Sequence, residues 1–334
     1  MPASAERGWT HPDRSAVVAH ARELGLRSIR LPRHAELFSR AFATSCVDPG
    51  SQELELRISL APLAFSATTG SADSRHDLAA LTLVLWTAVD LLDDVADGDL
   101  GAEWAEYDAN ELVVMASSLL AGTSHLVVAS LHAPPPVAAR LHERIARGLC
   151  TMADGQIADI AHTGRNDVSA DAIVASIAGK TGAECAMFAG LGAILAEAPA
   201  ERVEHFERFG LEFGIASQLL SDVADACSLE GGRDLANRTR TLPLAWHLDS
   251  LSGAARVAFF EALDAAPADD RVASGVREAL LASPALRRCV LQIMVHIERA
   301  RSALALAGPT GPAASVLTDF LDGLNPLGPA YSGR

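Results

Sequence analysis

Four aspartates, Asp90, Asp93, Asp94 and Asp97, follow a long and largely apolar run from Leu78 to Val89. On a helix with 3.6 residues per turn, Asp93 and Asp97 lie one turn apart on the same face, with Asp94 beside them. Like charges at this spacing destabilise a helix unless something offsets their repulsion. Hard divalent cations prefer oxygen ligands and often bridge carboxylates to phosphates. The stretch therefore indicates a metal–phosphate site, the alternative being a solvated helix end.

A second group of polar side chains follows another apolar segment, residues 213–220. It places Gln218, Ser221, Asp222 and Asp225 on one predicted helix, with the two carboxylates three residues apart. Unpaired charge is costly in apolar surroundings, so both acidic helices need a partner. Two such faces across a helical bundle would clamp a metal–diphosphate group.

Lys180 is the only lysine, because all the other 26 of the 27 basic residues are arginines. Lysine carries a compact charge, whereas arginine presents a planar fork. Lys180 lies in Gly179-Lys180-Thr181-Gly182, between two apolar segments that read as helical. This position makes it a candidate phosphate contact, the alternative being an ordinary surface lysine.

The periodicity of apolar residues predicts an all-α protein, since alternation typical of strands is nowhere convincing. With 334 residues and 49% hydrophobic content, the chain can bury a large core. We predict one large helical bundle over residues 1–324, with a frayed tail over 325–334. The predicted helices span residues 14–26, 33–46, 52–66, 74–97, 108–131, 135–161, 169–179, 181–197, 200–229, 241–250, 252–264, 269–281, 284–306 and 312–323.

Composition narrows the possible partners and location. The net charge of −15 argues against binding to nucleic acid or to anionic membrane surfaces. No run of 18 uninterrupted apolar residues and no signal-peptide pattern is present, so we expect a cytoplasmic protein without stable membrane insertion. The five cysteines have no metal-binding spacing and are expected to be buried free thiols.

Several motifs, in the same order along the chain, resemble those of the trans-isoprenyl diphosphate synthases, the polyprenyl synthetase family. Asp93-Asp94-Val95-Ala96-Asp97 matches the first aspartate-rich motif, DDxxD. Gly155-Gln156-Ile157-Ala158-Asp159 resembles the family's GQxxD, and Gly179-Lys180-Thr181 its KTG. The stretch from Phe209 to Leu244 resembles the second aspartate-rich region and the TLPL segment after it.

This resemblance implies the all-α class I isoprenoid synthase fold. In that fold, two acidic helices bind three Mg²⁺ ions that grip an allylic prenyl diphosphate, and loss of the diphosphate leaves a carbocation in an apolar cavity. The resemblance also implies a homodimer. Carried over position by position, it gives Asp93, Asp94, Asp97, Asp222, Asp225 and Ser221 as metal ligands, Lys180 and Gln218 as diphosphate-site contacts, Arg233, Arg238 and Arg240 as cations near the leaving group, and Trp86, with Leu85 and Val89, beside the prenyl chain.

The chain also departs from the family pattern. Ser221 replaces the first aspartate of the second motif, and Glu230 is a further candidate ligand. Where elongating synthases carry GKRxRP, this chain has Arg57-Ile58-Ser59-Leu60-Ala61-Pro62, and the segment from Gly98 to Asn110 contains no Lys or Arg. A second diphosphate, that of isopentenyl diphosphate, would have few cations to bind it, so ordinary chain elongation is not expected.

Three functions remain open at this point. In the first, one prenyl diphosphate is ionised and its cation cyclises or is quenched, as in a terpene synthase. This reaction needs an apolar cavity with aromatic rings that stabilise cations; the candidates are Phe65, Trp86, Phe188, Phe206, Phe209, Phe213 and Trp246, unless they only pack the core. In the second, the chain is a prenyltransferase that passes the cation to isopentenyl diphosphate or another acceptor. In the third, it is a non-catalytic subunit of a heteromeric synthase.

Overall fold

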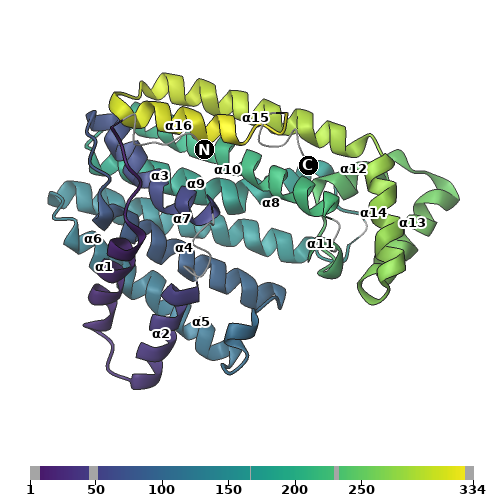
Figure 1. Cartoon of the computed structure of the whole chain (residues 1–334), viewed down its shortest axis with the longest axis horizontal. Helices are drawn as coiled ribbons and strands as arrows, with labels where there is room; N and C mark the ends of the chain where they lie inside the picture. The colour runs from purple at the N-terminus through teal and green to yellow at the C-terminus, as the bar shows by residue number, and fades with distance from the viewer. Residues whose placement is uncertain (1–7, 45–51, 166, 229–232, 328–334) are drawn as a thin grey trace. The chain divides into compact units, whose positions relative to one another are not determined.

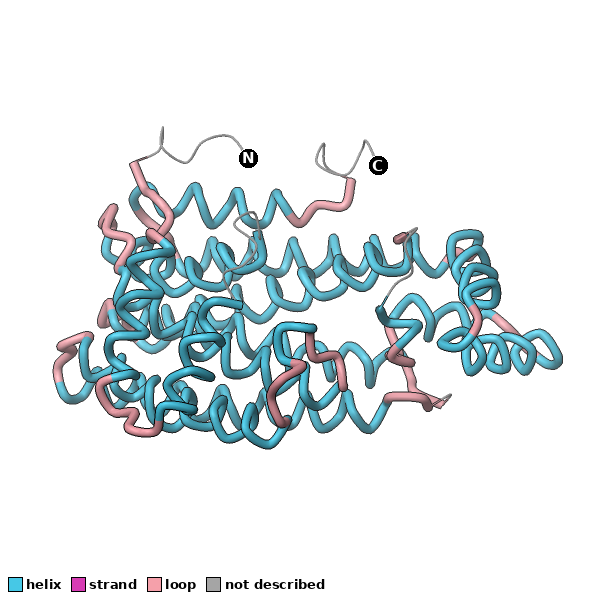
Figure 2. Tube along the Cα trace, turned by 60° about the horizontal axis from the view of Figure 1, so that its bottom comes forward, coloured by secondary structure: helices cyan, strands magenta, loops and turns pink. Residues whose placement is uncertain are grey.

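The computed structural model describes residues 8–44, 52–165, 167–228 and 233–327, apart from the side chains of residues 44, 52–54, 233 and 236. All regular structure in these ranges is helical (Figures 1 and 2), which confirms the all-α prediction. The helices are α1 (Arg14–Leu26), α2 (Pro32–Thr44), α3 (Gln52–Thr69), α4 (His76–Asp97), α5 (Ala109–Ser118), α6 (Ser124–Ser130), α7 (Pro135–His162), α8 (Ala170–Ile177), α9 (Ala183–Leu195), α10 (Ala200–Cys227), α11 (Arg233–Ala236), α12 (Leu242–Ser250), α13 (Gly253–Ala265), α14 (Asp270–Ala282), α15 (Ala285–Ala307) and α16 (Gly311–Gly323).

Each predicted range contains a helix whose ends differ from the prediction by a few residues. The main differences are two π-helical turns, η3 (Leu119–Thr123) between α5 and α6, and η4 (Ala178–Gly182) between α8 and α9. The sequence predicted a break near residue 180, and the chain instead continues through η4. Such turns are rare and often occur at functional sites.

The chain divides into two compact units, each of which is described by itself. The first consists of Met1–Gly148, Cys185–Arg208 and Ala303–Phe320, and the second of Leu149–Glu184, Phe209–Ser302 and Leu321–Arg334. The expected extent of the domain, residues 1–324, stays a prediction.

In the first unit the central element is α4, which packs against α1, α3, α5 and α6. Every residue from Leu78 to Leu85 is buried. A helix that is apolar on all sides belongs inside a protein core. Because this part of α4 is fixed in the core, it also fixes the position of the acidic carboxyl-terminal end of the helix.

In the second unit, α12, α13 and α14 enclose a small core. Its members are Leu244, Leu248, Phe259, Leu263, Ala266, Val276 and Leu280. Pro243 occupies the first turn of α12, where the missing N–H of proline costs nothing. The TLPL segment thus begins a helix that is anchored in this core.

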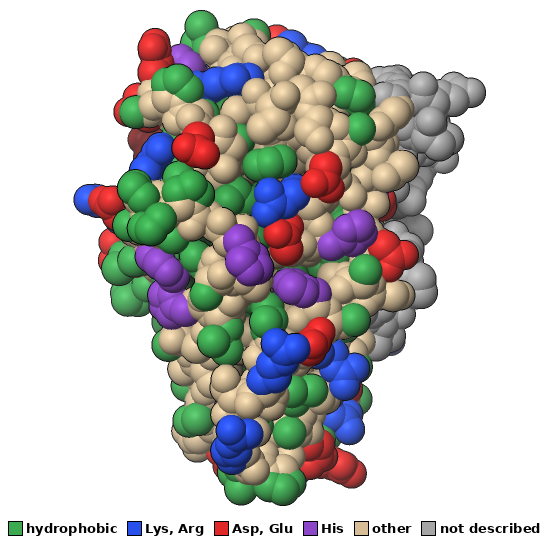
Figure 3. All heavy atoms as spheres, turned by 90° about the vertical axis from the view of Figure 1, so that its left-hand side faces the viewer, with side chains coloured by type: hydrophobic (Ala, Val, Ile, Leu, Met, Phe, Trp, Pro, Cys, Tyr) green, Lys and Arg blue, Asp and Glu red, His purple; other side chains and the backbone are tan. Residues whose placement is uncertain are grey.

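The apolar segment of α5, η3 and α6 is only partly covered. Residues 109–130 are long and apolar enough to cross a membrane by length and composition, and 44% of an apolar 18-residue window within them is buried. Its buried side packs on α4, while Val113, Val114 and Leu126 remain exposed. Elsewhere on the surface, Figure 3 shows a face on which acidic and basic side chains alternate and several histidines gather.

The described cysteines form no disulfide. Cys185 and Cys289 are buried, as expected, but Cys150 and Cys227 are exposed, so the expectation of burial is wrong for these two. Both lie where a helix borders solvent, Cys150 within α7 and Cys227 at the last residue of α10. Cys46 lies outside the described residues.

Candidate active site

The first group of aspartates occupies the last two turns of α4, within the first unit. Asp93 and Asp94 are half-buried, and Asp97, the last residue of the helix, is exposed. The helix stops at Gly98, whose φ of 70° is accessible to glycine at little cost, and the N–H of Asp99 donates to the carbonyl of Asp94 (2.9 Å).

Negative side chains at this end of a helix oppose its dipole. The last carbonyls of a helix carry partial negative charge, and a carboxylate beside them is unfavourable by about 0.3–1 kcal/mol. Asp93, Asp94 and Asp97 therefore repel both one another and the helix end. A cation bound here would relieve both repulsions, and the role of these residues as metal ligands stays a prediction.

Residues expected beside the prenyl chain lie one to two turns earlier on α4. Leu85 is fully buried, whereas Trp86 and Val89 are half-buried. The structure thus places Trp86 at the border between the buried part of α4 and its acidic end. Its contact with a prenyl chain stays a prediction.

In the second unit, five of the motif residues are joined by side-chain contacts, three of them in a chain and two as a separate pair. The Thr181 hydroxyl donates to Oε1 of Gln218 (3.0 Å), and Nε2 of Gln218 donates to Oδ1 of Asp222 (2.9 Å). Lys180, in the same π-helical turn as Thr181, lies 3.5 Å from Oδ2 of Asp159. The KTG turn, GQxxD and the second aspartate motif therefore meet at one place.

Carboxylates are crowded at this place. Asp222 is buried, and burial raises its pKa to about 7, with Asp159 and Asp225 adding repulsion. Burial also raises the pKa of Asp234 to about 8, and Asp222 and Asp225 contribute. The backbone N–H of Asp234 donates to Oδ2 of Asp225 (3.3 Å). Four acidic groups thus influence one another, and the positive charge of Lys180 acts on Asp222.

Glycines allow the helices to approach closely enough for these contacts. A Cβ on Gly155 of α7 would lie 2.4 Å from the carbonyl carbon of Gly179, and one on Gly214 of α10 would lie 2.5 Å from the carbonyl oxygen of Thr181. Real Cβ atoms do not make contacts this short. The backbones of α7 and α10 therefore touch the KTG turn directly, which brings Asp159 and Gln218 within reach of Lys180 and Thr181.

The arginines expected near the leaving group have local partners. Arg240 is buried, and its Nε donates to the carbonyl of Arg165 (2.6 Å) just after α7. Arg238 is exposed, with a left-handed φ of 58°, and donates to the carbonyl of Asp264 (3.4 Å). The side chain of Arg233 lies outside the described part of the chain. A role for the three arginines at a leaving group stays a prediction.

The two remaining metal-ligand candidates are placed differently. Ser221 is exposed on α10, beside the buried Asp222. Glu230 lies outside the described residues. Ligation by either residue therefore stays a prediction.

The candidate aromatic residues are mostly core residues. Phe188, Phe206 and Phe209 are fully buried. The ring of Trp246 already has the guanidinium of Arg288 4.1 Å from its centroid, and Arg75 lies similarly over Phe65 at 4.8 Å. Packing and existing cation–π contacts thus account for these five side chains.

The acidic groups have the donor type that Mg²⁺ prefers. In the part of the chain that the structure describes, no group of three or more His, Cys, Asp and Glu side chains is close enough to hold a metal ion by itself. Mg²⁺ is commonly held by one or two carboxylates together with substrate phosphates and waters. Pairs such as Asp93 with Asp97, or Asp222 with Asp225, are of that kind.

Two residues of the second unit belong to the site although the sequence analysis did not select them. Asp159 was noted only as part of a motif, yet it is the partner of Lys180. Asp234 follows Gly231, Gly232 and Arg233, and its carboxyl group interacts with those of Asp222 and Asp225. Asp234 lies within the stretch from Phe209 to Leu244 that resembles the second aspartate-rich region, and this resemblance could have indicated it.

The helical fold, the two acidic helix ends and the lysine in a π-helical turn define an all-α protein with a candidate metal–phosphate site. The model of the polyprenyl synthetase family matches residues 40–280. This chain is a member of the polyprenyl synthetase family. Members of the family act on prenyl diphosphates and typically use Mg²⁺.

Individual proteins agree with this assignment. The chain is 29% identical over 234 residues to a geranylgeranyl diphosphate synthase of Mycobacterium tuberculosis, a match that spans 66% of each chain and thus just under two thirds of the relative. Its fold is similar to that of a decaprenyl diphosphate synthase from Rhodobacter capsulatus, with a TM-score of 0.78, 22% identity, and 93% and 94% of the two chains covered. It is also similar to a polyprenyl synthase from Caulobacter crescentus solved with calcium and isoprenyl diphosphate, with a TM-score of 0.71, 21% identity, and 95% and 98% covered.

Proposed function

We propose that this chain is a Mg²⁺-dependent enzyme that ionises an allylic prenyl diphosphate. The observation that carries the proposal is the crowding of carboxylates at the motif residues of the second unit. Asp159, Asp222, Asp225 and Asp234 interact electrostatically with one another, Lys180 lies beside Asp159, and the pKa values of Asp222 and Asp234 are strongly raised. Such a group of carboxylates is stabilised at neutral pH when divalent cations bind to it.

The motif residues would bind two different groups, the metal ions and the diphosphate. Asp93, Asp94 and Asp97 of the first unit, and Asp222 and Asp225 of the second, would hold the metal ions, of which we propose three. Mg²⁺ supplies Lewis acidity, which neutralises the charge of the leaving diphosphate. Lys180 would contact the diphosphate, and Gln218 would orient Asp222 through the hydrogen bond that joins them.

For the fate of the prenyl cation we propose cyclisation or quenching within one substrate. The support is that the two segments expected to bind a second diphosphate contain almost no basic residues. Arg57 is the only basic residue of its segment, and Gly98–Asn110 has none. Two arginines of α2, Arg33 and Arg40, do reach the latter segment, but Arg33 is ion-paired with Glu111 and Arg40 is bonded to the carbonyl of Glu103.

Transfer of the prenyl group to an acceptor is the second candidate. It is supported by the relatives, because the similar proteins of known name are prenyl diphosphate synthases. The acceptor would be isopentenyl diphosphate or a molecule without a diphosphate group.

One experiment separates these functions. The protein is incubated with Mg²⁺ and the C10, C15 or C20 allylic diphosphate, with and without isopentenyl diphosphate, while pyrophosphate release and hydrocarbon products are followed. Release without isopentenyl diphosphate, with a cyclic or alcohol product, supports the terpene synthase reaction. Release only with isopentenyl diphosphate identifies a chain-elongating prenyltransferase. The absence of release under all conditions would refute ionisation of these substrates and favour the non-catalytic subunit.

We also propose that the protein is a cytoplasmic homodimer. The exposed apolar residues Val113, Val114 and Leu126 lie on the segment that is apolar enough for a membrane, and a second copy would cover them without a bilayer. Light scattering after size exclusion should show a dimer for the wild type and a monomer for Val114→Asp. Val257→Asp, on α13, changes a similarly exposed valine and should leave the dimer intact.

A further inference from the structure

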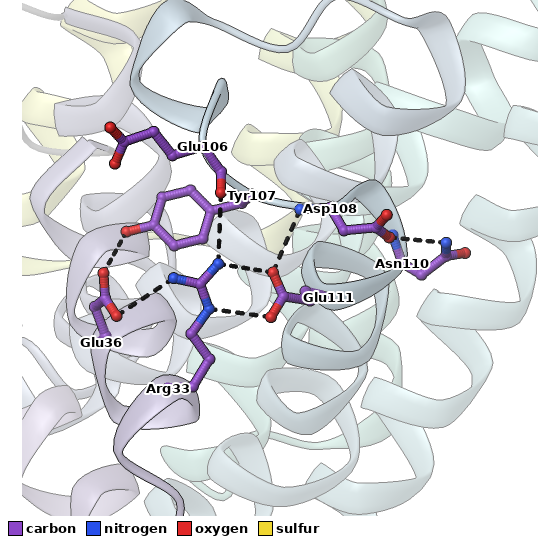
Figure 4. Close-up of polar contacts among 7 residues, drawn as sticks. All are labelled: Arg33, Glu36, Glu106, Tyr107, Asp108, Asn110 and Glu111. Atoms are coloured by element: carbon purple, nitrogen blue, oxygen red, sulfur yellow. Dashed lines mark hydrogen bonds and ion pairs between the residues drawn. The ribbon is translucent and has the colours of Figure 1, made fainter.

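The segment that follows the first aspartates is held by side chains from α2. Residues 98–108 connect α4 to α5 and contain no basic residue of their own. Arg33 and Arg40, which lie two turns apart on α2, both contact it (Figure 4 shows Arg33). The structure thus brings to this segment two cations that its sequence lacks.

Tyr107 is the centre of these contacts. Its ring centroid lies 4.4 Å from the guanidinium carbon of Arg33 and 5.1 Å from that of Arg40. Its hydroxyl donates to Oε1 of Glu36 (2.8 Å), and Arg33 donates to the other oxygen of the same carboxylate (3.4 Å). Tyr107 is nearly buried as a result, with 8% of its surface exposed.

The same arginine also fixes the start of α5. Nε and Nη2 of Arg33 donate to the two oxygens of Glu111, at 3.0 and 2.9 Å (Figure 4). Glu111 in turn accepts from the backbone N–H of Asp108 (3.3 Å), as part of a capping box. Arg33 therefore joins α2, Tyr107 and the cap of α5 in one network.

The network and the aspartates lie at opposite ends of residues 98–108. Nη1 of Arg40 donates to the carbonyl of Glu103 (3.0 Å), and buried Trp104 packs edge-on against Tyr107 at 5.8 Å. At the other end of the segment, the N–H of Asp99 closes the last turn of α4 on the carbonyl of Asp94. Both ends of residues 98–108 are thus tied down.

We propose that Arg33, Arg40 and Tyr107 are positioning residues: they hold residues 98–108 so that the last turn of α4 stays folded and presents Asp94 and Asp97 for Mg²⁺ in one arrangement. The need for such support follows from the repulsion among carboxylates at the negative end of a helix dipole, which favours fraying of that turn before a cation binds. The inference rests on the proposed function for the role of the metal.

Arg33 forms ion pairs with both Glu36 and Glu111. A positioning role and an effect of the electric field of these charges predict different results for substitutions in this network. A positioning role requires only that the contacts are made, whichever charge is removed.

Arg33→Ala and Glu111→Gln change the net charge in opposite directions but break the same bidentate pair. The first test measures binding of Mg²⁺ with inorganic pyrophosphate to the full chain by calorimetry. Both variants should bind Mg²⁺ about 10-fold more weakly, the range found when groups that orient metal ligands are removed. Shifts in opposite directions would show that the field of the charges acts, and would overturn the positioning role.

The second test follows backbone hydrogen exchange of residues 94–108 in metal-free protein. Exchange should be faster in Arg33→Ala and Tyr107→Ala, and less so in Tyr107→Phe, which keeps the ring and loses only the hydroxyl. Arg27→Ala, which breaks the exposed Arg27–Glu23 pair on α1, is the control and should match wild type in both tests. Circular dichroism checks that each variant is folded.

The outcomes separate the two proposals. Wild-type protein that binds no Mg²⁺ with pyrophosphate would refute the proposed function, and hydrogen exchange would then still decide whether the α2 contacts hold the segment. Wild-type binding with unchanged Mg²⁺ affinity in Arg33→Ala and Glu111→Gln would refute the positioning role alone. Unchanged exchange in folded Tyr107→Ala would refute it as well.

Discussion

Replacing Asp222 by Asn should stabilise the metal-free protein at high pH. Asp222 is buried on α10 with a pKa raised from 3.8 to about 7, chiefly by burial. An asparagine keeps the shape of the side chain and an oxygen that accepts the hydrogen bond from Gln218. The substitution therefore removes the buried charge with little other change.

The size and sign of the change in the free energy of unfolding follow from proton linkage. The folded protein binds the Asp222 proton more tightly than the unfolded chain, so its free energy of unfolding falls as pH rises from about 4 to about 7. A pKa difference of this size lowers the free energy of unfolding by at most about 4 kcal/mol at high pH. Relaxation of the protein around the charge makes this loss smaller. We expect Asp222→Asn to be more stable than wild type by about 1–3 kcal/mol at pH 8, and by little at pH 4.

Urea unfolding at pH 4, 6 and 8 in the presence of a chelator measures this difference. Asp249→Asn, a change of an exposed aspartate in the same unit, is the control and should show no such pH dependence. Mg²⁺ with pyrophosphate should stabilise wild type more than Asp222→Asn at pH 8. A variant that is less stable than wild type at pH 8 without metal would refute the claim that the buried charge of Asp222 destabilises the metal-free protein.

Further predictions concern the other parts of the site. The double change Asp93→Asn and Asp94→Asn should abolish pyrophosphate release without loss of the fold seen by circular dichroism; a folded variant that still turns over would exclude the metal role of this helix end. Lys180→Ala should weaken pyrophosphate binding in calorimetry more than it weakens Mg²⁺ binding, and equal affinity for pyrophosphate would show that Lys180 does not contact it. Gly155→Ala should lower the free energy of unfolding by about 1–3 kcal/mol, because its Cβ would overlap the backbone of Gly179. Gly275→Ala, on α14 with no atom within 4 Å of the new Cβ, should be neutral or stabilising.

Most helices could be predicted from the sequence because their boundaries depend on local chemistry. Gly98 ends α4 in the left-handed conformation, and α7 begins within the Pro-rich stretch 134–136. The π-helical turn at Lys180 was missed, since nothing in Gly179-Lys180-Thr181-Gly182 distinguishes it from an ordinary break. That turn depends on α7 and α10 packing against it through Gly155 and Gly214.

The site itself was only partly predictable. The aspartates of both motifs were found because acidic residues at helical spacing after an apolar run are unusual. Asp159 and Asp234 were missed as site residues because only packing brings them to Lys180 and Asp222. Gly98–Asn110 contains no basic residue of its own. In the folded protein, however, Arg33 and Arg40 of α2 contact this segment.

By itself, the amino-acid sequence determined the helical class, the ends of most helices, the family, and the residue types able to hold Mg²⁺ and a diphosphate. These properties depend on side-chain chemistry and on spacings within a few turns of helix. The tertiary structure decided which carboxylates share one environment, how far their pKa values rise, and which arginines support the loop after the first aspartates. Burial and charge interaction depend on groups that are distant along the chain, so spacing alone could not reveal them.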